Sequence, residues 1–165
     1  MDDTKVNIEP TTGYLSILPA INYRAWFALA EFVDNSIQSY LNNKSKLKAT
    51  NPNYKLKIAI YVDNSEIKIL DNAAGISEKD FPRAFRAAAR PENTKGLSEF
   101  GMGMKTAACW FSPLWTVNTK PLGEKEVKIV TFNIAKIVKD DIKELDVKKT
   151  KAPSGQHYTQ VVLQK

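Results

Sequence analysis

The sequence has little of several features that would define a class by themselves. It has one cysteine, Cys109, which excludes an internal disulfide and favours a reducing compartment such as the cytoplasm. No run of 18 apolar residues occurs, so we expect no membrane span. The first twenty residues include Asp2 and Asp3 and lack the apolar stretch of a secretory signal. The remaining class is a globular, cytoplasmic protein, with Cys109 as a buried structural thiol.

Histidine and interleaved aromatics are scarce as well. His157 is the only histidine, so a metal site built on several histidines is not expected, and we assign it no role. The chain carries 24 basic and 18 acidic side chains, a net charge of +6 that suits an anionic ligand such as a nucleotide. Aromatic residues are not interleaved with the lysines as a single-strand binding groove requires. Nucleic acid stays a possible partner but is not predicted for this domain.

The pattern of apolar residues predicts an N-terminal arm over 1–20 and one domain over 21–165. The arm is polar and we expect it to be extended. The predicted elements are a helix over 24–41, a loop over 42–53, strands over 54–62 and 66–70, a capped helix from 77 to about 88, a loop over 89–100, a helix over 103–110, strands over 114–119 and 125–132, and a closing strand over 158–164. Helices between runs of hairpin-linked strands indicate an α+β two-layer sandwich, with helices on one face of a mixed, mostly antiparallel sheet.

The helix predicted over 24–41 has two distinct faces. Its expected buried stripe comprises Trp26, Leu29, Val33, Ile37 and Tyr40. Its polar face comprises Glu31, Asn35, Gln38 and Asn42. Glu31 and Asn35 lie one turn apart, so a carboxylate that can activate water adjoins an amide oxygen that can ligate Mg²⁺. Taken alone, this pattern favours the solvated face of a helix over a binding site.

Two further segments have the chemistry of a nucleotide site. Asp71 ends an apolar strand, where a carboxylate can accept a hydrogen bond from an exocyclic amine such as that of adenine, and Gly75 lets a base approach the backbone. Gly101 and Gly103 precede a helix start whose free N–H groups can hold phosphate, and Lys105 adds positive charge. Each segment alone is also an ordinary turn. Their occurrence together, in this order, favours a nucleotide site.

The stretches ALAEFVDNSIQSY (28–40), ILDNAAGI (69–76) and GLSEFGMGMKTAA (96–108) resemble the N box, G1 and G2 motifs of the GHKL (Bergerat-fold) ATPases. This superfamily includes type II topoisomerases, MutL proteins, heat-shock chaperones, MORC ATPases and histidine kinases, and the wording is closest to the MORC-like branch. The resemblance covers about residues 20–165. It implies a Bergerat fold, with ATP and Mg²⁺ as cofactors.

The resemblance also implies individual roles. Glu31 resembles the catalytic, water-activating glutamate, Asn35 the Mg²⁺-binding asparagine, and Asp71 the adenine-reading aspartate, beside Gly75 and Ile76. Thr159 resembles the threonine that supports this aspartate. The phosphate-binding segment comprises Gly101, Met102, Gly103, Met104 and Lys105. An ATP lid is implied over about 76–100, where Arg83, Arg86 and Arg90 lie.

Three residues depart from the family pattern. Ala73 replaces a glycine of the G1 turn, Gln38 replaces a second acid, and Tyr158 replaces the glycine before the threonine. The implied function is an ATP-dependent conformational and dimerisation switch, with slow hydrolysis because a following transducer domain is absent from this chain. Two alternatives stay open: the catalytic domain of a histidine kinase, and a non-catalytic binding module with a basic DNA-binding surface.

Overall fold

The computed structural model describes residues 10–86, 102–153 and 155–165. The helices in this part of the chain are α1 (Tyr14–Ile17), the 3-10 helix η1 (Leu18–Ala20), α2 (Ala25–Thr50), α3 (Phe81–Phe85), α4 (Gly103–Phe111) and α5 (Ile134–Lys139). The strands are β1 (Ile58–Val62), β2 (Glu66–Asp71), β3 (Leu114–Lys120), β4 (Glu126–Asn133), β5 (Val147–Lys151) and β6 (Tyr158–Gln164). None of the helices described has the length and apolar character needed to span a lipid bilayer.

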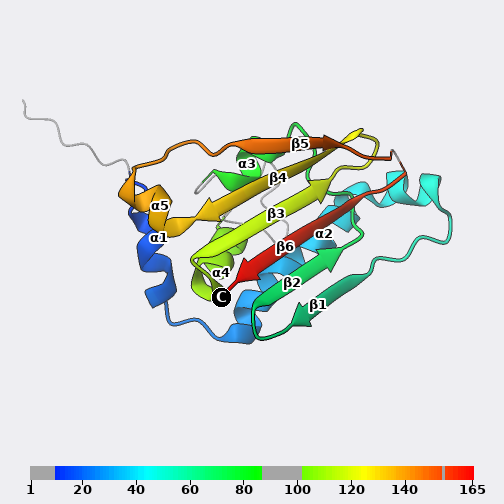
Figure 1. Cartoon of the computed structure of the whole chain (residues 1–165). Helices are drawn as coiled ribbons and strands as arrows, with labels where there is room; N and C mark the ends of the chain where they lie inside the picture. Colours follow the sequence, from blue (N-terminus) through cyan, green and yellow to red (C-terminus); the bar gives the residue numbers. More distant parts are fainter. Residues whose placement is uncertain (1–9, 87–101, 154) are drawn as a thin grey trace, which may run out of the picture.

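The strands form one sheet in the order β1-β2-β6-β3-β4-β5, and each neighbouring pair is antiparallel. Figure 1 shows the long helix α2 and the shorter α4 on one face of this sheet. The predicted α+β sandwich is therefore confirmed, as are the hairpins β1–β2 and β3–β4. The strand over 158–164 has the predicted bounds, but it lies inside the sheet, between β2 and β3.

Alternation along the central strands explains how the sheet holds the helices. Successive residues of a strand point to opposite faces, so every second side chain faces the helical layer. Trp115 and Val117 of β3 and Val161 and Leu163 of β6 are buried in the core on this rule. Trp115 also stacks on Phe132 of β4, with ring centroids 3.8 Å apart. The sheet therefore offers α2 and α4 a continuous apolar floor.

Helix α2 corrects two predictions. It continues to Thr50, through the segment expected to be a loop, because Leu47 is fully buried and the Gln38 and Asn43 amides bond within the helix. Its buried line is also different: Trp26 is 58% exposed. The buried residues are Ala28, Phe32, Ser36 and Leu47. Glu31 and Asn35 each follow a buried residue of α2, Ala28 and Phe32, by three positions, so they adjoin the true buried line.

Three smaller predictions also need correction. The arm is helical over α1 and η1, because Leu15 and Leu18 are buried beside α4 and α5. Strand β1 begins at Ile58, not at residue 54. It is an edge strand, and its last three residues, 60–62, are exposed. Helix α3 covers only Phe81–Phe85. Ser77 and Asp80 do bond reciprocally, but in the turn that precedes it. The loop expected over 89–100 lies outside the described residues.

Candidate nucleotide site

The carboxylate of Asp71 is the most enclosed acid of the candidate site. It lies at the end of β2, where Oδ2 accepts a 2.7 Å hydrogen bond from the Ser36 hydroxyl of α2. Oδ1 accepts a 2.8 Å bond from the backbone N–H of Ala73. Burial raises the pKa of Asp71, and these bonds, with one from the backbone of Thr159, oppose the rise. Thr159 is also the register partner of Asp71 across β2 and β6, so the backbone places both residues together.

Ser36 and Thr119 contribute to this end of the site and were not predicted from the sequence. Ser36 bonds both the Phe32 carbonyl and Asp71, so it fastens β2 to α2. Thr119 of β3 is fully buried and its hydroxyl meets the Ile76 N–H at 2.9 Å and the Thr159 hydroxyl at 3.2 Å. Only the position of Ser36, one residue after Asn35, offered a signal in the sequence. For Thr119 we find none.

The turn after Asp71 is held against the end of the β3–β4 hairpin. Gly75 has a φ of +70°, and a Cβ at this position would lie 2.5 Å from the carbonyl oxygen of Lys120. The Leu122 N–H also donates to the Ala74 carbonyl at 2.8 Å. Gly75 is therefore required by a turn that packs on backbone. Ala73 is fully buried and has no positive φ, so the alanine that departs from the family pattern fits without backbone strain.

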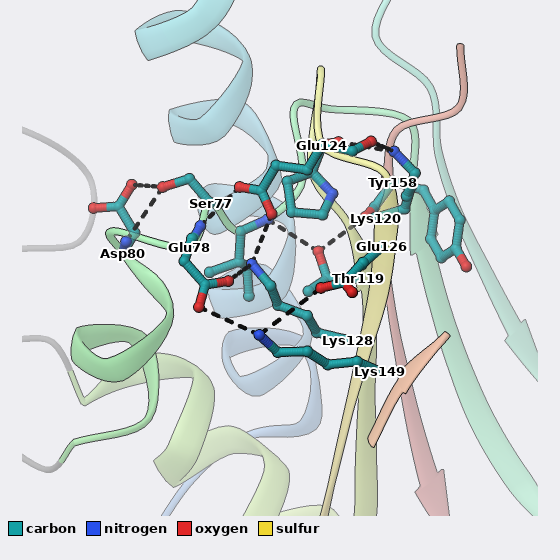
Figure 2. Close-up of polar contacts among 12 residues, drawn as sticks. Ser77, Glu78, Asp80, Thr119, Lys120, Glu124, Glu126, Lys128, Lys149 and Tyr158 are labelled. Atoms are coloured by element: carbon teal, nitrogen blue, oxygen red, sulfur yellow. Dashed lines mark hydrogen bonds and ion pairs between the residues drawn. The ribbon is translucent and has the colours of Figure 1, made fainter. Parts of the chain in front are cut away.

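A cluster of charged side chains fixes the next part of the same segment (Figure 2). Lys128 of β4 is 1% exposed, and its Nζ lies 2.6 Å from Glu78 Oε2 and 2.8 Å from Glu124 Oε2. Glu124 Oε1 accepts a 2.8 Å bond from the Glu78 N–H. Lys149 of β5 adds a longer ion pair of 3.5 Å to Glu78. Burial opposes the charge of Lys128, but the two carboxylates outweigh it and raise its pKa. The turn before α3 is thus bound to the sheet.

Glu31 belongs to α2, and its carboxylate reaches the start of α4. A Cβ built on Gly103, the first residue of α4, would lie 1.9 Å from Glu31 Oε2. Oε1 accepts a 3.2 Å bond from the Tyr23 hydroxyl. The pKa of Tyr23 is raised by its burial and then by the Glu31 charge, so the phenol stays a donor. The structure therefore brings the predicted base and the predicted phosphate-binding helix start into contact.

Asn35 follows Glu31 by one turn, and its Nδ2 donates to the Glu31 carbonyl at 2.6 Å. Because this bond uses the amide nitrogen, Oδ1 is the atom that would meet a cation. Carboxylate and amide oxygens are the ligands that Mg²⁺ accepts. The amide oxygen of Asn35 therefore fits Mg²⁺, and the Glu31 carboxylate lies one turn before it on α2.

Lys105 is placed differently from what its sequence position suggested. It follows Gly103 by two residues, so its side chain leaves the opposite side of α4 from Glu31. It is 3% exposed, and its Nζ donates to the Ala84 carbonyl of α3 at 2.8 Å. Burial, and then the nearby Arg83, lowers its pKa to about 8. Lys105 is thus buried between α3 and α4, and it holds its proton less tightly than an exposed lysine does.

The other predicted residues have different surroundings. Met102 occupies the N-cap position of α4 without a side-chain cap bond, and Met104 packs against the core. Arg83 pairs with Asp80 at 3.0 Å, and Arg86 is exposed at the end of α3. Gly101 and Arg90 lie outside the described residues.

Helix α2 is the element that joins the two halves of the site. Glu31 faces Gly103, and Ser36 holds Asp71. Five residues of α-helix separate Glu31 from Ser36, a rise of about 7.5 Å. Helix α2 therefore bears the candidate catalytic carboxylate and, between one and two turns further on, the serine that holds the candidate base-reading carboxylate.

The comparison with protein families supports the same region. The family model described as histidine kinase-, DNA gyrase B-, and HSP90-like ATPase matches residues 23–164. The match runs from before α2 to the last residue of β6, so it includes all the candidate site residues. A comparison with curated proteins gives no match.

Proposed function

The chain belongs to the histidine kinase-, DNA gyrase B-, and HSP90-like ATPase family, and from this premise we propose that it binds Mg²⁺-ATP, hydrolyses it slowly and acts as a conformational switch. The family assigns an ATP-binding domain of the GHKL type. The magnesium dependence, the hydrolysis and the switch are our proposal. Within the family we favour the MORC-like branch, because the motif sequences at 28–40, 69–76 and 96–108 resemble that branch most.

One observation carries the proposal: the carboxylate of Glu31 lies against Gly103, at the N-terminus of α4. Helix N-termini offer free N–H groups that bind phosphate. A carboxylate at that point does not help to hold a phosphate, because both groups are negatively charged and repel each other. It is well placed to take a proton from a water that attacks phosphorus. The pairing of base and phosphate cradle therefore favours hydrolysis over simple binding.

The remaining residues take roles that suit their surroundings. Asp71 accepts a hydrogen bond from the adenine amine, with Gly75 and Ile76 forming the adjoining turn and Thr159 supporting it. Residues 102–105 bind the phosphates through backbone N–H groups, and Lys105 supplies positive charge behind them. Asn35 holds Mg²⁺, which would neutralise phosphate charge when bound. Glu31 then removes the proton from the attacking water.

We propose that nucleotide state controls self-association and a downstream transducer-type domain. An exposed apolar group supports a partner surface near the start of α2. It comprises Ile17, Ile21, Trp26 and Phe27. Trp26 and Phe27 stack on each other with centroids 3.5 Å apart. Large exposed aromatics are typical of surfaces that other proteins cover.

Two substitutions test the function. In isothermal titration calorimetry, Asp71→Asn should weaken Mg²⁺-ATP binding about 100-fold, because one of the two buried acceptor oxygens is replaced by an amide N–H donor, which opposes the adenine amine. Glu31→Ala should leave the affinity within about threefold and remove phosphate release. Asp146→Asn, in an exposed loop, is the matched control and should change neither. Hydrolysis by Glu31→Ala at the parental rate would show that the base is misassigned, and unchanged affinity in Asp71→Asn would show that the site is.

A further inference from the structure

The two residues that follow Asp71 are held from outside by a pair of aromatic side chains, Tyr54 and His157. His157 Nδ1 lies 2.7 Å from the carbonyl oxygen of Ala73. The Tyr54 hydroxyl donates to the carbonyl of Asn72 at 2.6 Å. The two rings contact each other, with centroids 5.8 Å apart and an interplanar angle of 42°. We call Tyr54 and His157 the aromatic clamp.

The clamp acts on the same residue that orients Asp71. The N–H of Ala73 donates to Asp71 Oδ1, while the carbonyl of Ala73 faces His157. Residue 73 is therefore fixed on both of its polar groups. A carbonyl can only accept, so Nδ1 of His157 must carry a proton in this arrangement.

Tyr54 connects the clamp to the helix that bears the rest of the site. Its ring stacks on Tyr40 of α2, with centroids 5.8 Å apart. Its pKa is raised to about 12, first by burial and then by the charge of Asp71, so the phenol stays a hydrogen-bond donor. Asn72 Oδ1 also accepts from the Lys57 N–H at 2.7 Å, which ties the turn to the residues before β1. The clamp thus spans α2, the Asp71 turn and the approach to β6.

We propose that Tyr54 and His157 are positioning residues of the nucleotide site, which set the direction of the Asp71 carboxylate by holding the carbonyls of Asn72 and Ala73. This inference rests on the proposed function, since it assumes that Asp71 reads the base. Neither residue contacts the reacting atoms. Their effect therefore falls on affinity for the adenine end of the ligand, equally for ATP and ADP, and not on the rate of hydrolysis once the site is saturated.

The first test measures nucleotide affinity by calorimetry on the full chain. His157→Leu should bind ATP and ADP about tenfold more weakly, because a carbonyl that held Asp71 in place loses its donor. His157→Asn should restore binding to within about threefold, since its amide N–H can replace Nδ1–H. Tyr54→Phe should weaken both nucleotides by a similar factor to His157→Leu. Tyr61→Phe, at an exposed tyrosine of β1, is the control and should bind as the parent does.

The second test reads the clamp without nucleotide. Because His157 is the only histidine, ¹⁵N-histidine labelling gives one imidazole spectrum. The clamp requires a protonated Nδ1, and a neutral ring protonated only at Nε2 would overturn the inference. This measurement also covers the case in which His157→Leu fails to fold.

The outcomes separate the two levels of the argument. If the parent chain shows no saturable ATP binding, the proposed function fails and the inference falls with it. If the parent binds but His157→Leu and Tyr54→Phe bind equally well, only the inference fails. A lowered melting temperature with parental affinity would show that the clamp is merely structural. Loss for ATP alone would place the effect at the phosphates, and would also contradict it.

Discussion

The two ends of the candidate site are built in different ways. At the Asp71 end backbone groups make many of the contacts, namely the N–H of Ala73, the backbone of Thr159 and the Lys120 carbonyl pressed against Gly75, beside the bond from the Ser36 hydroxyl. At the Glu31 end they come from side chains, as in the 3.2 Å bond from the Tyr23 hydroxyl and the contact of the Glu31 carboxylate with Gly103.

The difference indicates how each end meets its ligand. Backbone belonging to three adjoining strands cannot move without disturbing the sheet, so the Asp71 end is formed before nucleotide arrives. Side chains can change rotamer at small cost, so the Glu31 carboxylate can adjust to the phosphates. We therefore expect substitutions at the Asp71 end to reduce stability and affinity, and substitutions at the Glu31 end to reduce turnover.

We expect the largest effect on stability at Gly75. Gly75→Ala forces a Cβ onto the Lys120 carbonyl, 2.5 Å away, at a φ of +70°, and should lower the free energy of unfolding by about 3 kcal/mol. Gly123→Ala is the matched control, because Gly123 has a similar φ of +80° with nothing within 4 Å of the added Cβ. Urea denaturation measures both. Equal losses would mean that the backbone packing at Gly75 contributes nothing.

Gly103 should show the opposite behaviour. The Cβ of Gly103→Ala meets only the flexible end of Glu31, and alanine suits a helix start, so stability should stay within about 1 kcal/mol of the parent. The Glu31 carboxylate must move, and turnover should fall about tenfold or more. Phosphate release and denaturation midpoints test this, with Gly155→Ala as the control because its Cβ enters open space. A large loss of stability with normal turnover would reverse our assignment of the two ends.

Lys105 gives the smallest effect and tests the Glu31 end from the far side of α4. Its pKa is about 8 without ligand, and a nearby triphosphate favours the charged form, so binding should raise the pKa. At pH 8, ATP binding should then take up as much as about half a proton. Calorimetry in buffers of different ionisation enthalpy measures this uptake, and Lys105→Met should abolish it. Binding without proton uptake would separate Lys105 from the phosphates.

Local patterns predicted much of the fold because they match the periods of the elements. The alternation over 158–164 predicted the bounds of β6. The glycine-rich segment predicted a helix from about Gly103, where α4 begins. The prediction of a loop after Leu41 was wrong, because the mostly polar residues there have the composition of a loop. In the structure the Gln38 and Asn43 amides bond within α2, and the buried Leu47 anchors its last turns.

The site shows the same limit. The order of motifs predicted that Glu31 and the glycine-rich start of α4 belong together, and the Glu31 carboxylate does meet Gly103. Ser36 was missed because a serine on a helix gives no sign of its partner, which lies 35 residues away. The charge of Lys105 is visible in the sequence, but the carbonyl of Ala84 that holds it is not. His157 was assigned no role because its contact with Ala73 depends on the strand order.

The central claim is that Asp71, Asn35, Glu31 and the start of α4 share one nucleotide. A crystal structure with Mg²⁺ and a non-hydrolysable ATP analogue tests it most directly. We predict the adenine amine on the Asp71 carboxylate, the ion on Asn35, and the phosphates on the N–H groups at the start of α4, with Glu31 facing the terminal phosphate. A nucleotide bound away from Asn35, Glu31 and Gly103, for example in the hollow of about 560 Å³ that Asp71 borders together with Tyr61 and Tyr158, would contradict the account.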